Sequence, residues 1–209
     1  MLTALAVTSA VSVALIVLAK WQRVYGRYGD FTTAVLIAWA IALPLVLPAP
    51  VRSGPADIWR STGAGVLVVI AALANLVIAH RFRWNLRRLR DLGESSLAHS
   101  WRTFGLMVIM APICEEYMFR GLLMHALLGY GVVVAVSVTT LVYVAAHLVW
   151  ASVPHLTIAG LLFAALALTT GGLLAPIIAH AIAGLLGFIV LFRFGPQVGL
   201  VQRQAAAVR

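Results

Sequence analysis

Two adjacent glutamates stand inside an otherwise apolar stretch of this chain. Glu115 and Glu116 lie there together, whereas the other four acidic residues fall in polar connecting segments. A carboxylate within a bilayer costs several kcal/mol unless it is paired or hydrated, so its presence there favours a function. Two carboxylates so close together resist joint ionisation, and such a pair can hold a proton donor beside a base. The residues therefore offer acid–base chemistry in an apolar setting.

Helical periodicity points the two carboxylates in different directions. Glu116 and Arg120 have i, i+4 spacing, so they can pair along one helix face, and Glu115 points about 100° away. A purely structural ion pair between helices is the alternative interpretation. Pro112 leaves the Val108 carbonyl without its helical donor, so we expect a kink with bound water beside the glutamates.

Two histidines lie within other apolar stretches. His147 and His180 have no soluble segment nearby, so each needs a polar partner or water. A hydrogen bond between helices would explain either histidine alone. Taken with the two glutamates on a third stretch, however, the imidazoles can converge on one cavity. Such a set can activate water.

The composition places these residues in a membrane protein. Hydrophobic residues form 63% of the 209 residues and charged residues only 10%, with a mean hydropathy of +1.02. We therefore predict an all-α, polytopic integral membrane helix bundle that forms one domain over residues 1–209. The net charge of +9 comes from short basic connections. This is a topology signal, so the expected partner is the lipid bilayer and no nucleic acid.

The apolar stretches predict about seven transmembrane helices. Their ranges are 2–19, 31–47, 63–79, 103–128, 132–153, 154–170 and 173–194. The Arg-rich segment 81–90 is expected to extend into the cytoplasmic interface or to lie on it. With the N-terminus outside, the cytoplasmic connections would hold twelve basic residues and the exterior one only two. The positive-inside rule then predicts an N-out, C-in protein. Its expected location is the bacterial inner membrane.

Three motifs, one on each of three predicted helices, resemble those of the CPBP family. This family contains type II CAAX prenyl proteases and bacteriocin-processing or self-immunity proteins. The motifs here are Glu115-Glu116-x-x-x-Arg120, Tyr143-x-x-x-His147 and His180-x-x-x-Gly184. In the family the second motif usually begins with Phe and the third usually ends with Asn. The resemblance covers roughly residues 100–195, which form the predicted catalytic core.

The resemblance implies an intramembrane glutamic endopeptidase that needs no cofactor. Its substrate would be a membrane-associated protein or peptide, and a prenylated protein is not expected. By this resemblance Glu115 would activate water, His147 would help to hold it, and His180 would stabilise the oxyanion. Arg120 would orient Glu115 and Glu116 and balance their charge. The sequence does not choose among peptides, leader sequences and C-terminal sorting tails.

Position 184 departs from the family pattern, because glycine stands where asparagine is usual. One expected hydrogen-bond donor is then missing unless another residue supplies it. Asn75 and the hydroxyl of Tyr143 are the candidates, in that order. Alternatively, Gly184 is a packing residue, since its helix carries a stripe of small residues that lets a neighbouring helix approach.

Three other interpretations stay open at this point. A zinc peptidase could use His147, His180 and a glutamate as ligands, although no His-Glu-x-x-His helix is present. A cysteine protease would use Cys114, which has no cationic neighbour of its own. A non-enzymatic membrane protein, such as a proton-coupled transporter or an immunity or binding protein, would explain the paired carboxylates equally well.

Overall fold

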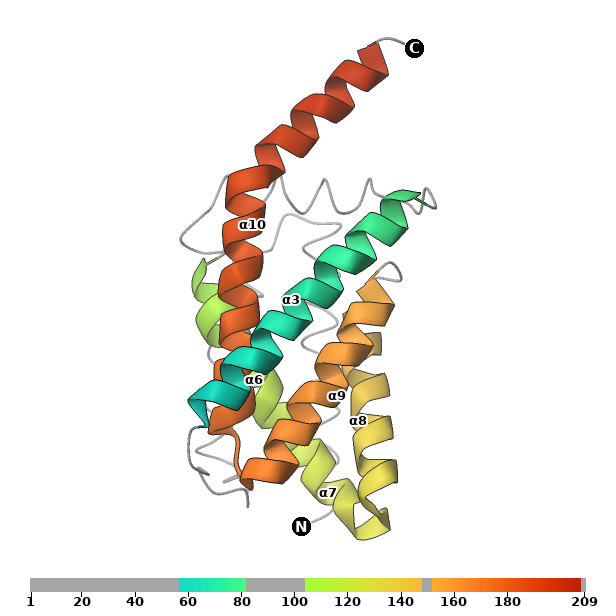
Figure 1. Ribbon diagram of the computed structural model, residues 1–209. Helices are drawn as coiled ribbons and strands as arrows, with labels where there is room; N and C mark the ends of the chain where they lie inside the picture. Colours follow the sequence, from blue (N-terminus) through green and yellow to red (C-terminus); the bar gives the residue numbers. More distant parts are fainter. Residues whose placement is uncertain (1–56, 82–103, 148–151, 208–209) are drawn as a thin grey trace, which may run out of the picture.

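The computed structural model describes residues 57–81, 104–147 and 152–207 (Figure 1). Within these ranges every regular element is a helix and no strand occurs, so the all-α prediction is confirmed for them. The predicted spans 2–19 and 31–47, and the Arg-rich segment from residue 82 onwards, lie outside the described residues. The seven-helix count and the orientation therefore stay predictions.

The described helices correspond to the last five predicted spans. The second of these five spans is a succession of α, π and 3₁₀ turns, and the other four are single α-helices. The elements are α3 (Ile58–Arg81), η1 (Gly105–Met110), α6 (Ala111–Glu116), η2 (Tyr117–Met124), α7 (His125–Leu127), η3 (Leu128–Tyr130), α8 (Val132–Ala146), α9 (Val153–Thr170) and α10 (Leu174–Ala207). The last helix outruns its predicted span, because the Gln, Arg and Ala residues near its end are good helix formers.

Two of the described helices are long and apolar enough to cross a membrane. The qualifying stretches are Ile58–Asn75 in α3 and Val153–Thr170 in α9, with mean hydropathies of 1.4 and 1.7. Shorter apolar stretches lie in α8 and in the first half of α10. Large aliphatic side chains are exposed on the outside of the bundle, among them Val133 and Leu141. Such a surface suits contact with lipid and would be unfavourable in water.

Small residues let the helices approach closely. α3 packs against α10 and α9, and α8 packs against α9 (Figure 1). A Cβ atom on Gly65 of α3 would lie 2.7 Å from the Ala179 carbonyl oxygen of α10. A Cβ atom on Gly160 of α9 would lie 2.7 Å from the methyl group of Thr140 on α8. The backbones of α3 and α10 therefore come into direct contact next to His180, and α9 lies against a side chain of α8, as small residues allow in membrane bundles.

The turns between the helices bring His147 and His180 to one level. His147 follows the last residue of α8, whereas His180 lies near the beginning of α10. Both rings lie beside that of Tyr143, with ring centroids 4.6 Å away for His147 and 6.4 Å away for His180. Gly171 ends α9 with a φ of +66°, a left-handed conformation that glycine adopts without strain.

The helix that carries the glutamates has wide turns on both sides of them. The π-helical segments η1 and η2 flank α6, which contains Glu115 and Glu116 and has Pro112 in its first turn. π turns therefore lie on both sides of the segment that contains Pro112, whereas the kink with bound water stays a prediction. Proline removes a hydrogen bond and crowds the carbonyl four residues earlier, which a wider turn relieves. Such π segments often mark functional positions within α-helices.

Gly184 packs against the backbone of η1. A Cβ atom at this position would overlap the Met107 carbonyl oxygen and lie 3.1 Å from the Met107 carbonyl carbon. Backbone atoms cannot swing aside as a flexible side chain can. The packing interpretation of Gly184 therefore has direct structural support, and an asparagine at this position would not fit without moving a helix.

We predict that Gly184→Ala and Gly184→Asn lower the stability of the protein by about 1–3 kcal/mol, as overpacking does. Thermal unfolding in detergent measures the effect. Gly187→Ala on the same helix is the matched control, because its added Cβ would meet nothing within 4 Å. Equal stability of Gly184→Ala and Gly187→Ala would contradict the packing role.

Candidate active site

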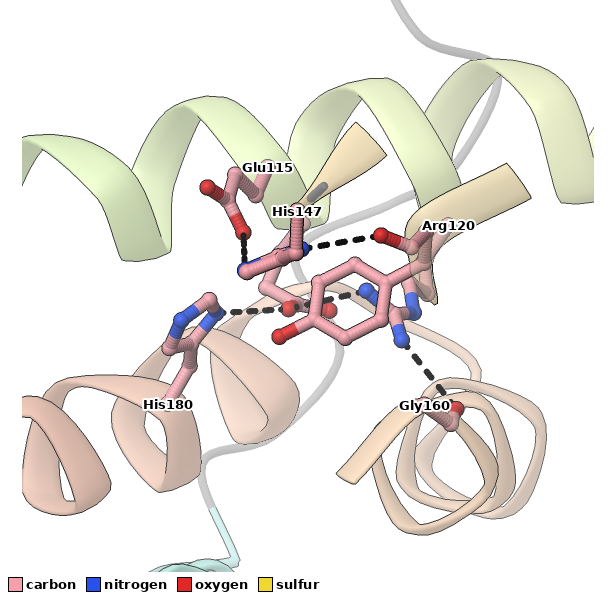
Figure 2. Close-up of polar contacts among 7 residues, drawn as sticks. Glu115, Arg120, His147, Gly160 and His180 are labelled. Carbon is pink, nitrogen blue, oxygen red and sulfur yellow. Dashed lines mark hydrogen bonds and ion pairs between the residues drawn. The ribbon is translucent and has the colours of Figure 1, made fainter. Parts of the chain in front are cut away.

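Glu116 and Arg120 form a fully buried ion pair within one helix. Arg120 Nη1 donates to Glu116 Oε1 at 3.0 Å, and neither side chain is exposed. The predicted i, i+4 pairing is therefore confirmed. Arg120 Nη2 also donates to the Gly160 carbonyl oxygen at 3.1 Å, as Figure 2 shows. The guanidinium thus ties η2 to α9.

Aromatic rings surround the Arg120 guanidinium. Its central carbon lies 4.7 Å from the ring centroid of Tyr143, 5.5 Å from that of Phe163 and 5.9 Å from that of Phe119. Cation–π attraction to these rings compensates part of the lost hydration. One carboxylate, one carbonyl and three rings therefore keep this charge in an apolar interior.

His180 joins the same carboxylate from α10. Its Nδ1 lies 2.9 Å from Glu116 Oε1, and because a carboxylate accepts, Nδ1 carries the hydrogen. The imidazole stacks on Phe163 with ring centroids 5.0 Å apart, which holds its plane. Within the described chain Nε2 makes no hydrogen bond. A protonated Nε2 would make His180 an imidazolium with Glu116 as its counter-ion, and that form could donate to a new anion.

His147 faces Glu115 in a geometry that its own backbone defines. Nδ1 donates to the Tyr143 carbonyl at 2.8 Å, one of the carbonyls left unpaired where α8 ends. In the neutral ring Nε2 is then an acceptor. It lies 3.8 Å from Glu115 Oε2 (Figure 2), too far for a direct hydrogen bond. Two acceptors at this separation suit a water molecule that donates one hydrogen to each.

Tyr143 stands at the centre of the cluster. Its ring centroid lies 4.6 Å from that of His147, 5.3 Å from that of Phe119 and 6.4 Å from that of His180. The residue is only 2% exposed. The second and third motifs therefore meet the first around one aromatic ring.

Asn75, the first candidate for the missing donor, and Gly184, the position that lacks it, both lie apart from this cluster. Asn75 Nδ2 lies 3.4 Å from His155 Nδ1, so the amide of α3 contacts a histidine near the start of α9. Gly184 lies one turn beyond His180 and packs on Met107 of η1. Neither observation supplies the donor that the third motif lacks.

Sequence reasoning missed Gly160, Phe119 and Phe163. Gly160 acts through a backbone carbonyl, which has no signature in the side-chain pattern. The two phenylalanines belong to apolar stretches and look like ordinary core residues there. The signal that could have found Phe119 is its place inside the first motif, next to Arg120.

Metal binding has no clear donor set in the part of the chain that the structure describes. No group of three or more His, Cys, Asp and Glu side chains there is arranged to hold an ion. Glu116 Oε1 already accepts from both Arg120 and His180. Cys114 is partly buried in α6 beside the glutamates.

The fold and the site define a class: a helical membrane protein with carboxylates and imidazoles gathered inside its bundle. Residues 97–186 match the family model described as "Type II CAAX prenyl endopeptidase Rce1-like". This segment is therefore similar to an endopeptidase family that is embedded in membranes, and the resemblance predicted from three motifs is confirmed. It contains every residue of the predicted site except Asn75. No curated protein and no solved structure matches the chain.

The buried pair predicts unequal effects for two neighbouring substitutions. Glu116→Gln leaves the Arg120 charge without its counter-ion and should lower stability by about 3–5 kcal/mol. Glu115→Gln should cost much less, because Glu115 faces His147 and not Arg120. Thermal unfolding of both variants in the same detergent compares them. Equal losses would refute the view that Glu116 is the structural member of the pair.

Proposed function

We propose that this protein is an intramembrane endopeptidase of the glutamic type, with Glu115 as the base that activates water. The observation that carries the proposal is the opposition of Glu115 Oε2 and His147 Nε2 across 3.8 Å. Because His147 Nδ1 is committed to a backbone carbonyl, both groups that face each other are acceptors. A water molecule between them has its oxygen lone pairs free to attack a carbonyl carbon.

The proposed reaction runs through a tetrahedral intermediate. Glu115 takes a proton from the water while its oxygen bonds to the scissile carbonyl carbon, and the carbonyl oxygen becomes an oxyanion. The carbon–nitrogen bond then breaks, and Glu115 returns the proton to the leaving amine. The products are a carboxylic acid and an amine, and no oxidant or co-reactant is needed.

His180 is suited to stabilise the oxyanion. Its Nδ1 hydrogen bond to Glu116 orients the ring, and the carboxylate balances an imidazolium charge. Nε2 can then donate to the oxygen that becomes negative, in a site where water is scarce. Glu116 and Arg120 are positioning residues in this scheme, because they hold His180 and do not touch the substrate.

The substrate class that we propose is a membrane-associated protein or peptide. The family description names a CAAX prenyl endopeptidase, so a peptide with a farnesylated C-terminal Cys-aliphatic-aliphatic-X tail is one probe. A mixture of peptides derived from a bacterial proteome is the second probe, since it tests unmodified substrates together.

Removal of the proposed base should abolish cleavage while the protein remains folded. We expect Glu115→Gln, His147→Ala and His180→Ala each to lower the rate by at least about 10³-fold, because these groups act on the reacting atoms together. Purified variants in liposomes are incubated with both probes, and the products are followed by mass spectrometry. Asp57→Asn, which changes a partly exposed carboxylate at the start of α3, is the matched control.

Retained cleavage in Glu115→Gln would overturn the proposed mechanism. A wild-type protein that cleaves neither probe would remove the enzymatic proposal and favour the non-enzymatic interpretation.

A glutamic mechanism also predicts the metal content. We expect purified protein to carry no stoichiometric metal and its activity to resist strong chelators. Elemental analysis and a chelator titration test this expectation. One tightly bound zinc ion per chain, with activity lost on its removal and regained on its return, would favour a metallopeptidase.

A further inference from the structure

We propose that the hydroxyl group of Tyr143 is a second hydrogen-bond donor to the oxyanion, beside His180. This inference rests on the proposed function and adds a catalytic residue to it. The phenol would keep its proton throughout: it donates a hydrogen bond to the developing negative charge and releases it when the product carbonyl or acid leaves.

The first support is the position of the ring. Tyr143 packs on His147, the neighbour of the proposed water, and its ring also approaches His180, with centroids 4.6 and 6.4 Å away. A carbonyl carbon attacked between Glu115 and His147, with its oxygen directed at His180, must lie beside this ring.

The second support is the state of the hydroxyl. Tyr143 is 2% exposed, and its hydroxyl makes no hydrogen bond with the described residues. A buried donor without a protein partner in the described chain is available to a substrate oxygen.

The third support is that most other hydrogen-bond donors of the site already have acceptors. Arg120 Nη1 and Nη2 are committed to Glu116 and to the Gly160 carbonyl, and His147 Nδ1 is committed to the Tyr143 carbonyl. Position 184 has no room for a side chain. Arg120 Nε has no hydrogen-bond partner, but it is fully buried. The Tyr143 hydroxyl and His180 Nε2 are therefore the donors among these groups that we assign to the oxyanion, and donors preorganised in a dry site act most strongly.

Tyr143→Phe tests the proposal, because it removes the hydroxyl and keeps the ring that packs on Arg120 and Phe119. We expect kcat to fall by about 10²–10³-fold, the usual cost of one oxyanion donor. KM should change little, since the contact forms only in the transition state. The rates are measured in liposomes on any peptide, farnesylated or unmodified, that wild-type protein cleaves and Glu115→Gln does not.

Two further measurements separate this role from others. Thermal unfolding of Tyr143→Phe should match wild type, because the hydroxyl has no partner to lose, and the shape of the pH–rate profile should be unchanged. Tyr130→Phe removes the same atom from an exposed tyrosine and should have no effect on the rate.

The outcomes distinguish this inference from the function on which it rests. A wild-type kcat in Tyr143→Phe, with Glu115→Gln inactive, would overturn the role of the hydroxyl and leave the glutamic mechanism standing. A raised KM with unchanged kcat, or a displaced limb of the pH profile, would assign the hydroxyl to binding or proton transfer instead. Cleavage by Glu115→Gln, or none by wild type, would remove both proposals.

Discussion

The burial of one arginine charge governs the arrangement of this bundle. Arg120 has no exposed side-chain surface, and its two polar partners are Glu116 within its own helix and the Gly160 carbonyl on α9. Glu116 in turn accepts from His180 on α10. Isolated ions cannot remain in such an interior, so these helices must keep the relative positions that satisfy them. The same constraint orients His180.

Adjacent glutamates can therefore serve different purposes. Glu116 turns towards the buried cation, whereas Glu115 turns towards His147, whose side chain keeps some exposed surface. The two side chains point apart because successive residues of an α-helix are rotated by about 100°. In our proposal it keeps the base for water activation apart from the ion pair that holds the framework, so that the two carboxylates do not compete for one cation.

Close backbone contact is the second requirement of the site. Gly65 brings α3 onto α10, Gly160 brings α9 onto α8, and Gly184 brings α10 onto η1. α3 lies outside the segment that matches the family, residues 97–186, yet it packs on the helix that carries His180. The contact at Gly184 leaves that position without a donor, which is why a hydroxyl on the neighbouring ring of Tyr143 matters for the proposed chemistry.

Local sequence patterns predicted the described helices and one ion pair of the site. Apolar runs located the described helices, and i, i+4 spacing paired Glu116 with Arg120, because both depend on neighbours along the chain. Tertiary structure alone decided that Gly160 supplies a carbonyl, that Asn75 contacts His155, and that Gly184 meets Met107. Which backbone carbonyls act as acceptors, and which helices touch, depends on how distant segments pack. The order of side chains along the sequence does not specify this packing.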